Sequence, residues 1–405
     1  MKKFTSIIII VLICVSLFTT SCGNGSVCRH QKIDTVGREA NCYIEGLTQG
    51  IRCSICGEIL KKQEPIPKTN HNYVEGVCTI CNNPLPVTTL AFKEVNNGES
   101  YAVTGRGSFF GNVLVIPEEY NGKPVTEISD EAFLYNFDIT KVVIPDTVKK
   151  IGAAAFAECQ NLTTALICGD VEFKNGVFFG CKRLTRCEFF GKVTSIPELV
   201  FAYCTSIEEF EIPDDVTEIG YQAFYACSKL RNINLKNNIE SIGESAFSGT
   251  DIRNIIIPYK VKTINPKTFE NCKELEEITI GMGVVSIEEK AFAGCEELSC
   301  VIIPDNVRKI GTKVFYECDY LTEVDIGDGI EELPTHLFYK CPKLKKITLG
   351  KNVLYIQENI FAACPGIEEV HVENLERWLM FGDGGLYENS RNAKVYHNGE
   401  LVKNK

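Results

Sequence analysis

Six cysteines and two histidines between residues 28 and 81 have the types and spacing of metal ligands: Cys28, His30, Cys42, Cys53, Cys56, His71, Cys78 and Cys81. Two Cys-x-x-Cys pairs stand among them. Each pair can present two thiolates to one ion from a single tight turn, and zinc takes four such ligands in a tetrahedron. Eight ligands suffice for two four-coordinate sites, so the sequence predicts structural zinc in a zinc-ribbon-like module over residues 28–83.

Three disulfides are the alternative use of the same six cysteines, and an oxidising exterior would favour them. Under either reading the role is structural, because a segment with so little apolar sequence needs such cross-links to hold a fold. A redox-active Cys-x-x-Cys pair is disfavoured, since no βαβ pattern surrounds it. Through His71-Asn72-Tyr73 and Gly76-Val77-Cys78, the segment resembles short cysteine-histidine modules on surface proteins of anaerobic bacteria.

The chain contains no recognisable catalytic motif. There is no Walker loop, no Gly-x-Gly-x-x-Gly after a strand and no His-Glu-x-x-His, and no His stands with Ser or Cys in a known arrangement. Carboxylates are numerous, but they recur periodically and form no unique pair. The net charge of −11 argues against a nucleic-acid partner or an anionic membrane surface. We therefore expect a protein that is not an enzyme.

A phenylalanine that returns every 22 or 23 residues organises most of the sequence. It occurs at Phe133, Phe156, Phe178, Phe201, Phe224, Phe247, Phe269, Phe292, Phe315, Phe338 and Phe361. Self-similarity at such a period predicts a solenoid, in which stacked units bury a core that no unit can cover alone.

One repeat, from Leu321 to Cys341, shows the expected local structure. Val324 and Ile326 at its fourth and sixth places flank Asp325 at the fifth, as in a short strand with alternating faces. A Pro or Gly often follows this strand and turns the chain. The fifth place of each repeat is therefore predicted to point outward. Its members are Val143, Leu166, Glu188, Glu211, Asn234, Ile256, Thr279, Ile302, Asp325, Thr348 and His371.

The repeat resembles the leucine-rich repeat in its BspA-like bacterial variant. The matching residues include Ile144-Pro145 after the strand, Val148…Ile151-Gly152 at the bend and Ala155-Phe156…Cys159 on the return. The resemblance covers roughly residues 117–370. It implies an α/β-type repeat solenoid of about eleven repeats, mostly β and irregular, with a parallel sheet on its concave face. It also implies attachment to host proteins or other cells, for which Glu188 to Thr348 of the outward row are the candidate contacts.

Nine cysteines occupy the place three residues after the repeating phenylalanine: Cys159, Cys181, Cys204, Cys227, Cys272, Cys295, Cys318, Cys341 and Cys364. Asn136 takes this place in the first repeat. A small, apolar side chain that can also meet backbone groups suits a stacked turn, so we expect these thiols to be buried, reduced and unreactive.

The two ends indicate export and closure of the solenoid. Residues 1–21 read as a signal peptide, Cys22 as a lipidated N-terminus and 22–27 as a tether, which predicts a cell-surface or outer-membrane lipoprotein bound to the membrane only by its lipid. A secreted protein is the alternative. Residues 84–116 are expected to form a linker and N-terminal cap. Residues 371–405 should form a C-terminal cap with Trp378 as a lid and a hairpin at Asn398-Gly399.

From the sequence alone we expect a non-catalytic cell-surface solenoid for protein binding or adhesion. The alternative is a metal-binding or redox surface protein that uses residues 28–81.

Overall fold

The computed structural model describes residues 31–40, 42, 45–53, 58–74, 76–380 and 393–402. The predicted signal, the lipidation residue Cys22 and three of the candidate metal ligands, Cys28, His30 and Cys56, lie outside these residues. The chain divides into two compact units, Met1–Leu85 and Pro86–Lys405, which are described separately. Within the described residues, no helix is long and apolar enough to cross a membrane.

Short antiparallel strands make up the first unit. One sheet joins β1 (Lys32–Thr35), β3 (Gly50–Cys53) and β4 (Ile59–Lys61), and a second joins β2 (Gly46–Leu47) to β5 (Pro65–Ile66). A hairpin of β6 (Tyr73–Val74) and β7 (Val77–Cys78) turns through Gly76, whose φ is +79°. Among the described residues of this unit, the buried apolar side chains are Cys42, Cys53 and Cys78. The core of the unit is thus made of sulfur-bearing side chains.

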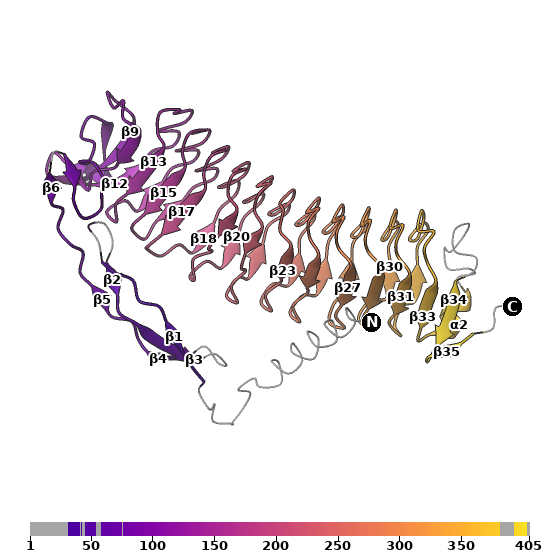
Figure 1. Cartoon of the computed structure of the whole chain (residues 1–405). Coiled ribbons are helices and arrows are strands. Elements are labelled where there is room, and N and C mark those ends of the chain that lie inside the picture. The colour runs from indigo at the N-terminus through magenta and orange to yellow at the C-terminus, as the bar shows by residue number, and fades with distance from the viewer. Residues whose placement is uncertain are drawn as a thin grey trace. The chain divides into compact units, whose positions relative to one another are not determined.

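The second unit is a solenoid whose repeats are strands and tight turns, as Figure 1 shows, which confirms the predicted repeat fold. Its first parallel ladder is built from the strands at places three to six of successive repeats, and these strands pair in four separate groups of neighbours. They are β10 (Val113–Val115), β13 (Lys141–Ile144), β15 (Thr164–Ile167), β17 (Arg186–Phe189), β19 (Glu209–Phe210), β21 (Asn232–Ile233), β23 (Asn254–Ile256), β25 (Glu277–Thr279), β27 (Cys300–Ile303), β29 (Glu323–Ile326), β31 (Lys346–Leu349) and β33 (Glu369–Val372).

A second parallel ladder runs through the bend of each repeat, and its strands also pair in four separate groups of neighbours. Its strands are β12 (Lys123–Ile128), β14 (Lys150–Ile151), β16 (Glu172–Phe173), β18 (Ser195–Ile196), β20 (Glu218–Ile219), β22 (Ser241–Ile242), β24 (Thr263–Ile264), β26 (Ser286–Ile287), β28 (Lys309–Ile310), β30 (Glu332–Leu333) and β32 (Tyr355–Ile356). Each contributes an apolar side chain to the core: β12 buries two, Val125 and Ile128, and Ile356 of β32 is half-buried.

Both ends of the solenoid are closed by added strands. At the amino end, β8 (Ala91–Val95), the 3-10 turn η1 (Asn96–Gly98) and β9 (Ser100–Gly105) form a hairpin that extends the second ladder through β12, with β11 (Glu119–Tyr120) beside it. At the carboxyl end, helix α2 (Leu375–Met380) buries Trp378 against the core. The predicted hairpin is present as β34 (Lys394–His397) and β35 (Glu400–Leu401), and it turns through Asn398-Gly399 with positive φ at both residues.

The repeating phenylalanines form one continuous column inside the solenoid. Consecutive rings from Phe133 to Phe361 lie 5.1–5.8 Å apart between centroids, with interplanar angles of 3–17°. All are buried. The inward orientation predicted from the period is therefore confirmed, and each ring packs against the ring of the repeat before and after it.

Each phenylalanine lies between two residues with left-handed backbone. In the repeat of Phe156 these are Ala154 (φ +52°) and Glu158 (φ +56°), and every other repeat has the same pair two residues before and two residues after its phenylalanine. Because left-handed residues stand two places before and two places after Phe156, the N–H groups of Ala154, Phe156 and Glu158 all point along the stack. They donate to carbonyls of the next repeat at 2.6–3.0 Å. Inter-repeat hydrogen bonds thus offset the usual cost of this backbone, about 1 kcal/mol per residue.

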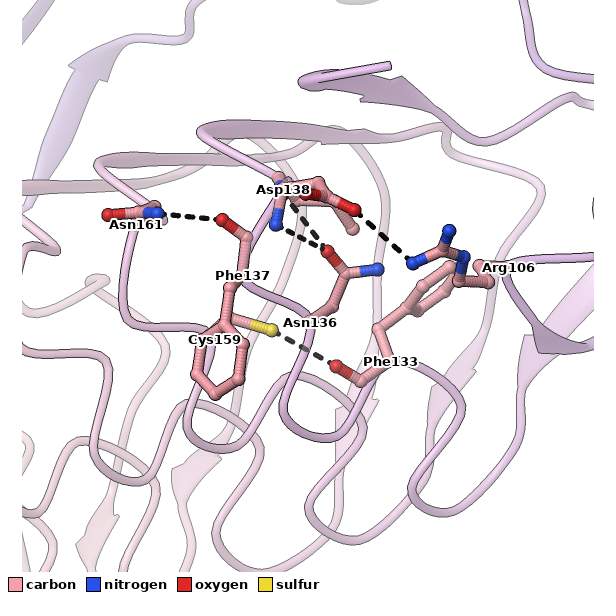
Figure 2. Close-up of polar contacts among 8 residues, drawn as sticks. Arg106, Phe133, Asn136, Phe137, Asp138, Cys159 and Asn161 are labelled. Carbon is pink, nitrogen blue, oxygen red and sulfur yellow. Dashed lines mark hydrogen bonds and ion pairs between the residues drawn. The ribbon is translucent and has the colours of Figure 1, made fainter. Parts of the chain in front are cut away.

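The repeat cysteines form a second set of hydrogen bonds between the turns of neighbouring repeats. Each Sγ donates to the backbone carbonyl of the phenylalanine one repeat earlier, at 2.8–3.3 Å. Figure 2 shows the first case, Cys159 to Phe133, beside Asn136, which accepts from the backbone of Asp138 and Ile139. Burial raises the pKa of Cys159 and Cys227 to about 12, so these thiols keep their proton. The prediction of buried thiols is confirmed.

Candidate binding face and metal-ligand cluster

One face of the first ladder points away from the core, and we call it the strand face. It consists of the third and fifth places of the repeats, because side chains alternate along a strand. In β29, Val324 and Ile326 are buried while Asp325 between them is exposed. Parallel pairing in register then aligns Ile302, Asp325, Thr348 and His371 in one row.

Most of the predicted outward row does face solvent. Glu211, Asn234, Ile256, Thr279, Ile302 and Asp325 are exposed, and Glu188 and Thr348 are half-buried. Val143 was predicted outward, and this is wrong because its side chain is fully buried. Its register partner Val115 is fully buried as well, while Leu166 on the other side is half-buried. The row is therefore covered at its amino-terminal end, where its members are apolar.

The middle of the strand face is acidic. From β19 to β29 its two rows contain no lysine or arginine and five carboxylates, Glu209, Glu211, Glu277, Glu323 and Asp325. The third-place acids were not singled out as contacts from the sequence, although the two-residue alternation from the fifth place would have found them. Lys236, just beyond the two rows, has its Nζ 2.5 Å from Glu211 Oε1 and 3.3 Å from Asp214 Oδ1. The other four acids have no such neighbour among the ion pairs of the described residues.

Asp325 shows the electrostatic effect of this arrangement. Desolvation by the surrounding sheet raises the pKa of its carboxyl group, the carboxylates of Asp305, Glu373 and Asp328 raise it further, and Lys346 lowers it. Negative charge is thus concentrated on this part of the face at a cost to the folded state.

Two isoleucines form an apolar centre within the acidic stretch. The side chains of Ile256 and Ile302 are 67% and 52% exposed, and Thr279, the register partner of Ile256, comes from the strand between theirs. Exposed aliphatic side chains with a charged border are a usual feature of protein-binding surfaces.

In the first unit, four of the eight predicted ligands come together. The Sγ atoms of Cys42 and Cys78 lie 3.5 Å apart, and the Sγ of Cys81 lies 3.7 Å from Nδ1 of His71. All four ligand atoms are within 4.8 Å of one another. Cys42 and Cys78 are buried, whereas His71 and Cys81 are half-buried.

The β6–β7 hairpin and the turn after it position two of these ligands, Cys78 and Cys81. Asn82 has a left-handed φ of +55° and its N–H donates to the Cys78 carbonyl at 2.9 Å, which closes the Cys78–Cys81 turn. Burial raises the pKa of Cys78, but hydrogen bonds from the backbone of Cys81, Ile80 and Asn72 and from the His71 side chain outweigh it and lower the pKa to about 5. This turn therefore stabilises a thiolate. Burial and the neighbouring Cys78 thiol raise the pKa of Cys42 to about 11.

The arrangement differs from the expected pairing of two Cys-x-x-Cys turns. Cys42 and His71, and not the Cys53 turn, complete the set around Cys78 and Cys81; Cys53 is buried but does not belong to the group. Cys28, His30 and Cys56 lie outside the described residues. The lone Cys42 had no spacing signal that would have assigned it to this set. The metal itself stays a prediction.

A family model matches most of the solenoid. It is described as the BspA type leucine rich repeat region (6 copies), and its matches cover residues 126–250, 171–276 and 262–378. Together these span more than half of the 405 residues. No curated protein matches the chain.

Three solved bacterial structures are similar to this chain over most of its length. A leucine rich cell surface protein from Faecalibacterium prausnitzii is 26% identical to this chain, with a TM-score of 0.52. The match covers 78% of this chain and 96% of the Faecalibacterium chain. A leucine-rich repeat protein from Bacteroides ovatus is 21% identical, with a TM-score of 0.45 and coverages of 77% and 99%. The pneumococcal vaccine antigen PcpA is 19% identical, with a TM-score of 0.43 and coverages of 77% and 100%.

Proposed function

This chain belongs to the BspA-type leucine-rich repeat family, and from that premise we propose that it is a non-catalytic cell-surface protein that binds other proteins through its strand face. The observation that supports this most directly is the acidic stretch around the apolar centre of Ile256 and Ile302. A partner that fits it would present lysine or arginine side chains around one or more aliphatic ones.

The proposed location rests on the likeness to the Faecalibacterium protein, which is described as a leucine rich cell surface protein. We further propose that Cys22 carries a lipid that holds the chain at the membrane, since a small residue precedes it at the end of an apolar leader. The solenoid would then be exposed to proteins of host tissue or of neighbouring cells.

Reversing charge on the strand face tests the binding proposal. In Glu277→Lys with Asp325→Lys, two carboxylates on either side of Ile302 become cationic. The chain from residue 27 onward, immobilised, would be exposed to extracellular-matrix proteins and to bacterial surface proteins, and captured proteins quantified by mass spectrometry. We expect the parent to retain basic proteins in a salt-dependent way. The double variant should capture at least about tenfold less of these proteins.

The matched control is Glu218→Lys with Glu331→Lys. It changes net charge by the same amount, but Glu218 lies on the second ladder and Glu331 beside it, and both are exposed. This control should bind as the parent does. Equal loss in both double variants would show a non-specific charge effect, and unchanged capture by the strand-face variant would place binding elsewhere; either result contradicts the proposal.

A further inference from the structure

We propose that Cys42, His71, Cys78 and Cys81 hold one structural zinc ion that stabilises the first unit. The proposal concerns a different part of the chain from the strand face and does not depend on protein binding.

The distances among the ligand atoms fit a shared ion. In a tetrahedral site with Zn–S bonds near 2.3 Å, neighbouring ligand atoms stand about 3.7 Å apart. The Cys42–Cys78 separation is 3.5 Å and the His71–Cys81 separation is 3.7 Å. A disulfide would instead bring two sulfur atoms to about 2.05 Å. These two pairs thus have the spacing of two edges of one tetrahedron, and all four ligand atoms lie within 4.8 Å of one another.

Three soft sulfur ligands and one imidazole nitrogen select zinc among the common divalent ions, since calcium and magnesium take oxygen ligands. Four protein ligands also leave no open coordination position for a substrate or a water molecule. Such closed sites support a fold and do not catalyse reactions.

The surroundings of the cluster hold the ligands in place. The His71 ring stacks on Tyr73, with centroids 5.1 Å apart and an interplanar angle of 16°. Thr69 Oγ1 donates to the Cys42 sulfur at 3.8 Å, and Thr79 N–H donates to the carbonyl of Asn72 at 2.8 Å, which ties the Cys78 turn to the chain next to His71. Contacts of this kind fix ligand orientation before the ion arrives.

The composition of this unit explains why an ion would be needed. Its buried apolar side chains among the described residues are cysteines, so burial of hydrocarbon supplies little free energy for folding. Zinc that binds the folded but not the unfolded segment adds its binding free energy to the stability of the fold.

Metal analysis of the full-length chain, purified under reducing conditions without chelator, tests the site. Cys42→Ser and Cys78→Ser should each lose one equivalent of zinc relative to the parent. Cys300→Ser, which changes a half-buried thiol of the solenoid, should lose none. His71→Cys keeps four soft ligands and should retain the equivalent that His71→Ala loses. An unchanged zinc content in the two serine variants would overturn the proposal.

A second measurement needs no variant and covers the case in which the variants misfold. In the zinc-bound parent, Cys42, Cys78 and Cys81 should resist alkylation, and after chelation they should become reactive while the circular dichroism of the solenoid persists. Mass spectrometry of peptides identifies the protected residues. A disulfide at any of these three cysteines, or equal reactivity with and without chelator, would refute the site.

Discussion

The thiol of Cys159 donates to the backbone carbonyl of Phe133, one repeat earlier, at a sulfur–oxygen distance of 3.1 Å. The carbonyl also accepts the N–H of Asn136 within its own repeat at 3.0 Å. The phenylalanine that packs the core therefore has its backbone fixed by a cysteine of the next repeat. Because the contact recurs along the stack, sulfur links the repeats where their tight turns meet.

Truncation of one of these cysteines should destabilise the solenoid. Cys227→Ala removes the thiol that donates to the Phe201 carbonyl at 3.0 Å and leaves a small cavity. We expect a loss of about 1–2 kcal/mol in the free energy of unfolding, measured by urea denaturation. Cys300→Ala, at a half-buried position outside the thiol series, should cost about 0.5 kcal/mol or less. Equal losses would show that the thiol hydrogen bond contributes nothing.

Removal of one ring from the phenylalanine column should cost more. Phe224 is fully buried, and its ring centroid lies 5.4 Å from that of Phe201 and 5.5 Å from that of Phe247. Phe224→Ala should reduce the free energy of unfolding by about 3–5 kcal/mol. Glu211→Ala on the exposed strand face should change it by about 0.5 kcal/mol or less. Similar losses of thermal stability in both variants would contradict the assigned inside and outside of the repeat.

The sequence predicted the column, the ladder and the terminal hairpin because each has a strict local signal. The phenylalanine period, the alternation of Val324 and Ile326 around Asp325, and the pair Asn398-Gly399 each correspond to one physical requirement. Val143 fits the same alternation but is buried. Alternation predicts the side of the strand on which a side chain lies, but it does not predict whether other residues cover that side.

Two other features had no signal that a single sequence could show. The left-handed positions beside each phenylalanine carry lysine, glutamate, tyrosine and alanine as readily as glycine, since inter-repeat hydrogen bonds impose the backbone there. Cys42 is remote in sequence from Cys78, so only the fold brings the two sulfurs together. Long-range contacts of this kind are decided by tertiary structure and not by spacing.

Close stacking of the repeats leaves no room for a side chain at several glycines, and Gly283 is the tightest case. A Cβ added at Gly283 would overlap the backbone carbonyl of Tyr259 in the preceding repeat, and this carbonyl cannot rotate away. Gly283→Ala should therefore cost about 3 kcal/mol. Gly176→Ala is the control: its Cβ would meet only Phe179 Cβ at 3.7 Å, and its φ of +64° adds about 1 kcal/mol. Urea titrations of both variants measure the difference, and a larger loss for Gly176→Ala would contradict the stacking argument.

Neutralisation of Asp325 should stabilise the folded protein, because the charge of this carboxylate on the strand face lowers the free energy of unfolding. The pKa of Asp325 is raised in the folded protein, so the ionised carboxylate destabilises the fold. The protonated Asp325 carboxyl contributes stability at a pH below its pKa in the unfolded chain. This contribution is lost as the pH rises through its higher pKa in the folded protein. Asp325→Asn should therefore stabilise the protein at pH 7, by only a few tenths of a kcal/mol because solvent screens this exposed group, and the gain should vanish below about pH 3.5. Thermal denaturation at both pH values measures the effect, with Glu218→Gln on the second ladder as the control. A destabilised Asn variant at neutral pH would show that this carboxylate is held by favourable contacts and not retained for binding.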